Sequence, residues 1–442
     1  MNKAVKSALL SAAPWLVTLV FSGGAVPAVA DGHSERCLAP SGGDDTAALQ
    51  AALDRCSGAR RECSVALCHG VFRTGILRVR DFRGTLRGAG VRETVLRALP
   101  ELPVSDRPGF FRDDPFDATW PYLVQFFEGA ARIRDLGLSV PTPPEGSRPT
   151  TGWSLFEGEE PTFELRGAML LSGRGPVDFE VRDVRVVAEP DPASDLATTT
   201  FNGVEFGGLL HDPSAPEPFP VFPLRGRYRV TDSALEGVLS GTPLAEISGA
   251  DVRVEGNRYR STIAVDVIDA DRSQVAILGN RWTVSYRGVQ MLQNLDGSPS
   301  RESAFRVEAN VGRLVPLSAG VGDGLFFQDP IDASPEPGGT TLRAAGNRWR
   351  LGDATRPAAS GITTNGAARL RLLDNRLSGA AGTGLDVTAT EGCRIQDNSL
   401  GRLDTSPGPD LRLGSATSDC LALVSSHDVV VDEGTDNSIV RR

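Results

Sequence analysis

One short pattern recurs along the second half of this 442-residue chain, and it constrains the fold more than any other feature. The pattern is apolar-x-apolar-x-x-Asn-x-apolar, and its clearest copies contain Asn257, Asn280, Asn310, Asn347, Asn375 and Asn398. Successive Asn residues are 23, 30, 37, 28 and 23 positions apart. This repeat length indicates a solenoid in which one coil needs about 23 residues and extra residues form loops.

The residues around each Asn predict the geometry of one coil. Alternating apolar residues before the Asn predict a strand with one buried face. The three-residue step across the Asn breaks this alternation and indicates a bend, where Asn tolerates a left-handed backbone and bonds neighbouring backbone groups. Stacked coils should place these Asn residues in one hydrogen-bonded column. Their neighbours expected to be buried are Val254, Ile277, Val307, Leu372 and Ile395.

Earlier copies of the pattern carry another residue at the Asn position, and the first of them is Leu77, Val79 and Phe82. Another short strand precedes most copies and opens with Gly, as at Gly203, Gly288, Gly324, Gly361 and Gly384. Three strands per coil, stacked about eleven times, predict an all-β, right-handed parallel β-helix built as a three-sheet solenoid.

Residues 45–56 are expected to form a short amphipathic helix. Asp44 and Asp45 stand at its start, where acidic side chains favour the positive end of the helix dipole. Leu49, Ala52, Leu53 and Cys56 then recur at helical spacing on one face. The helix should cap the open N-terminal end of the solenoid, as terminal units of repeat proteins do. A catalytic role for the two aspartates is the weaker interpretation, because capping explains both.

The N-terminus has the features of an export signal. Lys3 and Lys6 precede an apolar run over residues 8–29, and Ala28-Val29-Ala30 forms an A-x-A cleavage site. We therefore predict a signal peptide over residues 1–30 and a secreted or periplasmic domain over residues 31–442. An uncleaved membrane anchor is the alternative. No other apolar run is long enough to span a membrane, so no membrane insertion is expected after cleavage.

All six cysteines follow the cleavage site, which predicts disulfides in an oxidising compartment. Two cysteines lie far from the other four, so we expect Cys393 to pair with Cys420. Among the four, Cys56–Cys63 would span one short connection and leave Cys37–Cys68. A metal site is the weaker alternative, because paired C-x₂-C spacing is missing.

Charge composition excludes several classes of function. The formal net charge is −10, and after residue 30 the chain has 44 Arg and no Lys. A lysine Schiff base, a lysine general base and a P-loop lysine are therefore excluded. The acidic balance also argues against a nucleic-acid partner, which requires a basic surface. The oligomeric state is not predicted.

Three segments together resemble the pectin-lyase-like right-handed parallel β-helix superfamily. They are GGDDTAALQAALDRC, VALCHGVFRTGILRVRDFRGTLRGAG and the G-N-R and D-N-R coils, and the resemblance covers nearly all of residues 37–440. It implies a long groove on the first sheet for an extended polysaccharide. Members of the superfamily include lyases, hydrolases and non-catalytic surface proteins. The family's paired-Asp hydrolase motif is missing here, and a lysine-base lyase is excluded.

Three carboxylates are the candidate catalytic residues. The outward residue of the first strand is expected to run down successive coils as Gln125, Leu170, Glu205, Glu246, Asp266, Gln290, Phe326, Thr363, Asp386 and Arg412. Glu205, Glu246 and Asp266 are three consecutive carboxylates in this column. Such a cluster can bind Ca²⁺, or divide into an acid of raised pKa and an ionised partner for glycoside hydrolysis. Ca²⁺ is the one cofactor considered. The structural alternative is an ordinary polar strand surface.

The candidate substrate-binding residues are Gln290, which follows in the same column, and Trp120 and Trp153 in long Pro-rich insertions beside it. The expected function is binding of an extended carbohydrate polymer, neutral or anionic, with cleavage by a lyase or hydrolase mechanism. The alternative is a non-catalytic surface or binding protein.

Another outward column is rich in arginine. Its expected members are Arg78, Arg132, Glu180, Arg229, Arg253, Ala276, Arg306, Arg343, Arg371 and Arg394. The residue before the Asn position is acidic in six of ten copies, at Asp81, Asp135, Asp183, Asp232, Asp374 and Asp397. A lattice of Arg–Asp pairs is the favoured interpretation. A stripe that binds an anionic polymer is the alternative.

Overall fold

The computed structural model describes ten segments of the chain. They are residues 37–60, 63–99, 122–140, 167–173, 175–188, 202–207, 224–293, 302–329, 339–402 and 408–442. The predicted signal peptide, Trp120 and Trp153 lie outside the described residues. Cys37–Arg442 forms one compact unit. No helix in the described segments is long and apolar enough to cross a membrane.

The described residues are almost entirely β-structure after a single helix, α1 (Thr46–Asp54). The strands are β1 (Cys63–Ala66), β2 (Gly70–Thr74), β3 (Leu77–Arg87), β4 (Thr94–Ala98), β5 (Tyr122–Val140), β6 (Gly167–Ser172), β7 (Pro176–Ala188), β8 (Asn202–Phe206), β9 (Leu224–Thr231), β10 (Ala234–Glu255), β11 (Arg258–Asp271), β12 (Gln274–Leu278), β13 (Arg281–Leu292), β14 (Ala304–Glu308), β15 (Val311–Leu314), β16 (Asp323–Gln328), β17 (Thr341–Ala345), β18 (Arg348–Leu351), β19 (Ala358–Asn365), β20 (Arg369–Leu373), β21 (Arg376–Gly379), β22 (Ala381–Thr388), β23 (Cys393–Gln396), β24 (Ser399–Arg402), β25 (Leu411–Leu413), β26 (Leu421–Val424), β27 (Val430–Asp432) and β28 (Ser438–Arg441).

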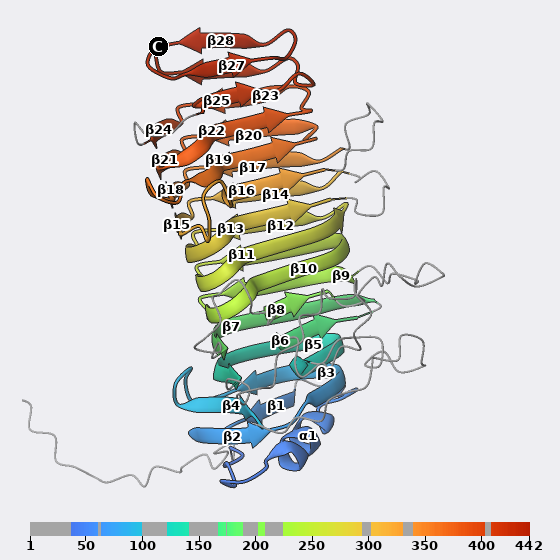
Figure 1. Ribbon diagram of the computed structural model, residues 1–442. Helices are drawn as coiled ribbons and strands as arrows, with labels where there is room; N and C mark the ends of the chain where they lie inside the picture. Colours follow the sequence, from blue (N-terminus) through green and yellow to red (C-terminus); the bar gives the residue numbers. More distant parts are fainter. Residues whose placement is uncertain are drawn as a thin grey trace, which may run out of the picture. The chain divides into compact units, whose positions relative to one another are not determined.

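Each strand pairs in parallel with the strand one coil later, so the coils stack in chain order (Figure 1). This confirms the parallel β-solenoid that the repeat predicts. Long strands such as β10 and β11 bend and contribute to more than one face. The first sheet contains 204–206, 242–245, 265–268, 289–292, β16, β19 and β22. The second sheet contains 252–255, β12, β14, β17, β20 and β23. The third sheet contains 258–261, 281–284, β15, β18, β21 and β24.

The predicted Asn column is confirmed at the bend between the second and third sheets. Asn310 is representative: its side-chain Nδ2 donates to Asn347 Oδ1 at 3.0 Å and to the Ile277 carbonyl at 2.9 Å. Its Oδ1 accepts from the backbone N of Asn280 at 2.9 Å. The same pattern links Asn257 through Asn398. The ladder therefore satisfies buried backbone groups that the bend removes from strand pairing.

The acidic residues before the Asn position have mainly a backbone role. Asp374 and Asp397 have φ of 54° and 55°, and Gly256 and Gly279 occupy the same place in other coils with φ of 68° and 60°. Asp and Gly are residues that adopt this left-handed conformation readily. The predicted Arg–Asp lattice forms only in part. Arg182, for example, lies 3.2 Å from Asp183 and 3.8 Å from Asp232 one coil on.

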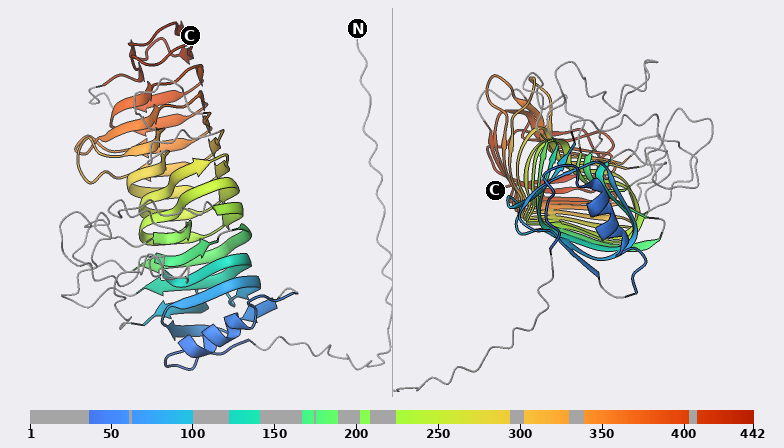
Figure 2. Two further views of the ribbon diagram at one scale, coloured as in Figure 1. Left: turned by 90° about the vertical axis from the view of Figure 1, so that its right-hand side faces the viewer. Right: turned by 90° about the horizontal axis from the view of Figure 1, so that it is seen from below.

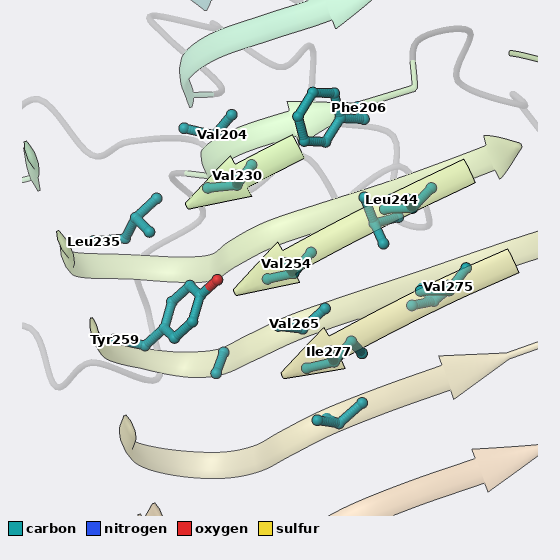
Figure 3. Packing of buried hydrophobic residues seen from close by; sticks show 14 of the residues in the cluster. Val204, Phe206, Val230, Leu235, Leu244, Val254, Tyr259, Val265, Val275 and Ile277 are labelled. Atoms are coloured by element: carbon teal, nitrogen blue, oxygen red, sulfur yellow. The ribbon is translucent and has the colours of Figure 1, made fainter. Parts of the chain in front are cut away.

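The interior is a stack of apolar side chains contributed by all three sheets (Figure 3). Val265 from the first sheet, Val254 and Ile277 from the second, and Tyr259 from the third point into the same space. All five predicted neighbours of the Asn column are buried. Two inward residues per short strand, such as Val275 and Ile277 of β12, therefore build a continuous core along the coils.

The N-terminal end is closed by α1, which lies across the first coils (Figure 2). Leu49, Ala52 and Leu53 are its buried residues, as predicted, although the helix ends two residues earlier than expected. Asp44 Oδ1 accepts from the backbone N of Thr46 at 2.8 Å, which satisfies a donor at the helix start. Asp45 instead accepts from Arg73 N at 3.1 Å and ties the helix to β2. Both aspartates are thus structural.

The structure joins the three expected cysteine pairs. Cys37–Cys68 and Cys56–Cys63 have Cα–Cα separations of 5.0 and 5.4 Å and hold the N-terminal cap together. Cys393–Cys420, at 4.3 Å, joins β23 to the start of β26 one coil later. No cysteine is left free.

The first expected copy of the repeat is out of register. Residues 77–80 of β3 pair with 124–127 of β5 on the first sheet, whereas 84–87 pair with 131–134 on the second. Arg78 therefore lies beside Gln125 and not in the arginine column, where Thr85 takes its place. The alternating pattern of Leu77 and Val79 fits either sheet, because a period of two does not identify the sheet to which a strand belongs.

Candidate functional site

The outward column of the first sheet follows the predicted order at every position but one. Strand register places Gln125, Leu170, Glu205, Pro243, Asp266, Gln290, Phe326, Thr363, Asp386 and Arg412 in successive coils. Glu205 and Asp266 are therefore on the same face, separated by one coil. Gln290 directly follows Asp266, as predicted.

Glu246 is not part of this column, which corrects the predicted trio. Pro243 takes its place, and Glu246 lies three residues further on, opposite Asp269. Glu246 and Asp269 both have left-handed backbones, with φ of 53° and 51°, so they form a bend and not a groove strand. The three carboxylates consequently do not form the predicted Ca²⁺ site. No three His, Cys, Asp or Glu side chains in the described segments gather closely enough to hold a metal.

The strand-opening glycine would have identified Pro243. Gly241 opens its strand two residues before Pro243, as Gly203 does before Glu205. The third sheet explains the glycine, since a Cβ at Gly241 would lie 2.2 Å from Cδ1 of the buried Tyr259 ring. The second residue after such a glycine therefore lies on the outward face of the first sheet.

Glu205 is held by one donor from its own strand, β8, and one from β5, two coils earlier. It is 5% exposed, and its Oε2 accepts hydrogen bonds from the Tyr122 hydroxyl and from Asn202 Nδ2 at 2.8 Å. The Tyr122 ring crosses the intervening coil over Gly167, where a Cβ would lie 2.2 Å from the ring. Tyr122 is 83 residues from Glu205 in sequence, so only the stacking of coils brings them together.

Asp266 has the electrostatics of a general acid. It is half-buried, and burial raises the pKa of its carboxyl group from 3.8 to about 6. Gln290 Nε2, which donates to Asp266 Oδ1 at 2.8 Å, and the Arg287 charge act in the opposite direction. The charge of Glu205 raises the pKa further. The two carboxylates thus interact across the coil of Pro243.

Arg287 and Asp323 extend the site and were missed by the sequence analysis. Arg287 donates through Nη1 to Gln290 Oε1 and lies 3.3 Å through Nε from Asp323 Oδ2. Its guanidinium carbon lies 3.6 Å from the centroid of the Phe326 ring. Both charged side chains are largely buried, at 13% and 6% exposure. Ser360 Oγ donates to Asp323 Oδ1 at 2.6 Å and carries the network one coil further.

A sequence signal for these residues does exist. Asn202, Arg287, Asp323 and Ser360 each directly precede a strand-opening glycine. Strand register stacks Arg287 on Asp323 and Asp323 on Ser360, which forms a second polar column beside the first. A search for polar residues just before these glycines would have found it.

A small hollow lies elsewhere, on the second sheet near the N-terminal end. Its volume is about 190 Å³, and Arg60, Arg83, Arg132 and Asp178 are among its lining residues. Asp178 is the one carboxylate among the lining residues and is paired with Arg227 at 2.7 Å. The carboxylate column of the first sheet is therefore the better candidate for chemistry.

Comparison with known proteins finds related architecture only. No protein-family model and no curated protein matches the chain. Among solved structures, the Azotobacter vinelandii mannuronan C-5 epimerase AlgE6 A-module is 14% identical, with coverage of 90% of this chain and 96% of that one and a TM-score of 0.44. The Streptococcus pneumoniae surface protein and adhesin PfbA is 11% identical, with 92% and 100% coverage and a TM-score of 0.44. DFA-IIIase from Arthrobacter chlorophenolicus A6 without its lid is 15% identical, with 89% and 91% coverage and a TM-score of 0.45.

The raised pKa predicts a pH-dependent stability difference between the wild type and Asp266→Asn. As pH rises from 3.8 towards 6, the unfolded chain releases the Asp266 proton first, so this group makes folding less favourable. Asn carries no proton to release. We expect Asp266→Asn to gain roughly 2–3 kcal/mol in unfolding free energy relative to wild type on going from below pH 3.8 to about pH 7.5. Urea titrations at both pH values measure this, and a constant difference would contradict the assignment.

Proposed function

We propose that the protein hydrolyses a glycosidic bond in an extended polysaccharide bound along the first sheet. In this proposal Asp266 is the general acid and Glu205 the general base. The observation that carries it is the unequal environment of two carboxylates on one face, since Asp266 has a pKa near 6 and Glu205 is fixed by Tyr122 and Asn202. Pairs of this kind are the usual machinery of glycoside hydrolysis.

The spacing of the pair favours an inverting reaction. Two coils separate the Glu205 and Asp266 backbones by roughly 10 Å, given about 4.8 Å per coil. Inverting enzymes hold their carboxyl groups about 6.5–9.5 Å apart to admit a water, whereas retaining enzymes need about 5–5.5 Å. Glu205 would take a proton from this water as its oxygen bonds to the anomeric carbon. Asp266 would give its proton to the leaving sugar oxygen.

The remaining groups of the site would position the polymer. Gln290 and Arg287 hold Asp266 in place and offer amide and guanidinium donors to sugar hydroxyls. The Phe326 ring is covered by Arg287, so this ring is not assigned to sugar stacking. A polysaccharide substrate also agrees with the resemblance to the pectin-lyase-like superfamily.

Localisation and winding belong to the same proposal. We infer a secreted or periplasmic protein, because three disulfides are typical of oxidising compartments. We also infer right-handed winding through about eleven coils, since crossover connections between parallel strands are right-handed in nearly all proteins.

A non-catalytic carbohydrate-binding protein is the second candidate. The observation that favours it is that the two carboxylates are already hydrogen-bonded within the protein, Glu205 to Tyr122 and Asn202 and Asp266 to Gln290. In that case the polar columns would bind sugars without cleaving them.

A polysaccharide panel tests the proposal. Neutral and uronate polymers are incubated with the protein, with Ca²⁺ or with EDTA, and reducing ends and unsaturated products are measured separately. We expect new reducing ends without unsaturated products, and an inverted anomer in the first product seen by NMR. Unsaturated products would show that the protein acts as a lyase and not as a hydrolase. Binding without any product would favour the second candidate.

A further inference from the structure

Seven arginines cover the outward face of the third sheet, a surface that the proposed function does not use. They occupy two neighbouring columns that follow the Asn ladder on 258–261, 281–284, β15, β18 and β21 (Figure 1). All seven are exposed. We name this surface the arginine face, and its members are Arg258, Arg260, Arg281, Arg313, Arg348, Arg350 and Arg376.

The arginine face has no acidic residue among its outward positions. The other outward residues on these strands are Thr283, Val311 and Ser378. Glu236 lies at the boundary, opposite Arg260, and is engaged by Arg185 at 3.2 Å. Within the described segments, none of the seven guanidinium groups forms an ion pair or a hydrogen bond, although the backbone N–H groups of arginines such as Arg258 and Arg281 take part in the coil ladder.

The second sheet shows what a paired arginine surface looks like in the same protein. There Arg306 and Arg343 both contact Glu308, at 2.7 and 2.8 Å, and Arg253 contacts Glu255 at 2.5 Å. The predicted lattice of paired arginines and carboxylates is therefore present on part of the second sheet. The lattice interpretation does not fit the third sheet, where the outward positions of the described strands contain no acidic residue.

The arrangement on the third sheet is unfavourable for folding alone. Register sets Arg258 directly opposite Arg281, Arg313 opposite Arg350, and Arg348 opposite Arg376. Like charges directly opposite one another destabilise a sheet. The strand itself does not require arginine, because Thr283 and Ser378 occupy equivalent places. Local conflicts without a structural benefit typically mark a functional surface.

We propose that the arginine face binds a polyanionic polysaccharide, with its chain running along the stacked coils. Guanidinium groups bind carboxylate and sulfate groups through paired hydrogen bonds. Rows of arginine repeat at about 4.8 Å, the coil spacing, which is close to the length of one pyranose residue. The inference goes beyond the proposed function, because it concerns another sheet and requires no cleavage.

Nucleic acid fits this surface less well. Single strands are usually held by aromatic side chains that stack on the bases, and no aromatic side chain in the described segments is exposed. Successive phosphates on one strand of a duplex are about 3.4 Å apart along the helix axis, and this spacing does not match the coil spacing.

A charge-matched pair of variants tests the arginine face. The test variant is Arg281→Gln/Arg348→Gln/Arg376→Gln, and the control is Arg55→Gln/Arg92→Gln/Arg225→Gln, whose arginines are exposed elsewhere. Binding to immobilised polygalacturonate is measured by biolayer interferometry between about 50 and 200 mM salt. We expect the test variant to bind at least about tenfold more weakly, with a shallower salt dependence, and the control to bind within about twofold of wild type.

Further measurements distinguish this proposal from misfolding of the variant, from binding at another site and from another anionic ligand. The test variant should melt at the wild-type temperature or above in low salt, because repulsion is relieved, which shows that it folds. A test variant that binds polygalacturonate as tightly as wild type would show that the polymer binds elsewhere, the first sheet included, and would contradict the proposal. No wild-type binding, equal weakening of both triple variants, or tighter binding to single-stranded DNA or phosphatidylglycerol vesicles would overturn the proposal.

Discussion

Replacing Asp266 by Asn is expected to lower kcat by about 10²–10⁴-fold on any polysaccharide that the wild type cleaves. The amide retains the shape of the side chain but has no acidic proton to give to the leaving oxygen. KM should change little, because Arg287, Gln290 and Glu205 stay in place. Initial rates of reducing-end formation, measured over a range of substrate concentrations, separate the two constants.

Glu246→Gln is the matched control for this experiment. It makes the same carboxylate-to-amide change one coil away, at a bend outside the polar columns. We expect its kcat within about twofold of wild type. The wild-type rate should also fall as pH rises above about 6, where Asp266 loses its proton, and this limb should be missing in Asp266→Asn. Full activity of Asp266→Asn would remove this residue from the mechanism.

Replacing Asn310 by Ala is expected to lower the free energy of unfolding by about 3–5 kcal/mol. The change leaves the backbone N of Asn280 and the carbonyl of Ile277 without their partners in a fully buried position. It also breaks the Asn ladder in its middle, because Asn347 Oδ1 loses a donor. Thermal or urea unfolding monitored by circular dichroism measures the loss.

Asn398→Ala provides the comparison within the same ladder. Asn398 is the last member and half-exposed, so water can replace its hydrogen bonds, and a loss of about 1 kcal/mol is expected. Equal losses at Asn310 and Asn398 would show that the ladder acts by backbone conformation and not by buried hydrogen bonds. Leu, which fills the space without restoring the bonds, should not rescue position 310.

The sequence alone determined the coil, its core and its bends. These features depend on neighbours within a few residues: alternation selects the buried face, and Asn after Gly or Asp selects the bend. Cysteine positions agree with the same coil length, because Cys393 and Cys420 are 27 residues apart and join adjacent coils. Errors occurred where local pattern is ambiguous. Leu77 and Val79 fit two sheets equally well. The alternation of apolar residues is also compatible with either Glu246 or Pro243 as the outward residue of its coil.

Only the tertiary structure decided which polar groups meet. Tyr122 reaches Glu205 across a whole coil, and Arg287 pairs with Asp323, 36 residues away. These contacts depend on the loop lengths that set each coil's register, which no local pattern encodes. The pKa of Asp266 likewise follows from burial and from a neighbouring charge, and the arginine face becomes visible only when register shows which arginines lack an acidic partner. Residue type and period are local properties, whereas desolvation and charge pairing are properties of the assembled stack.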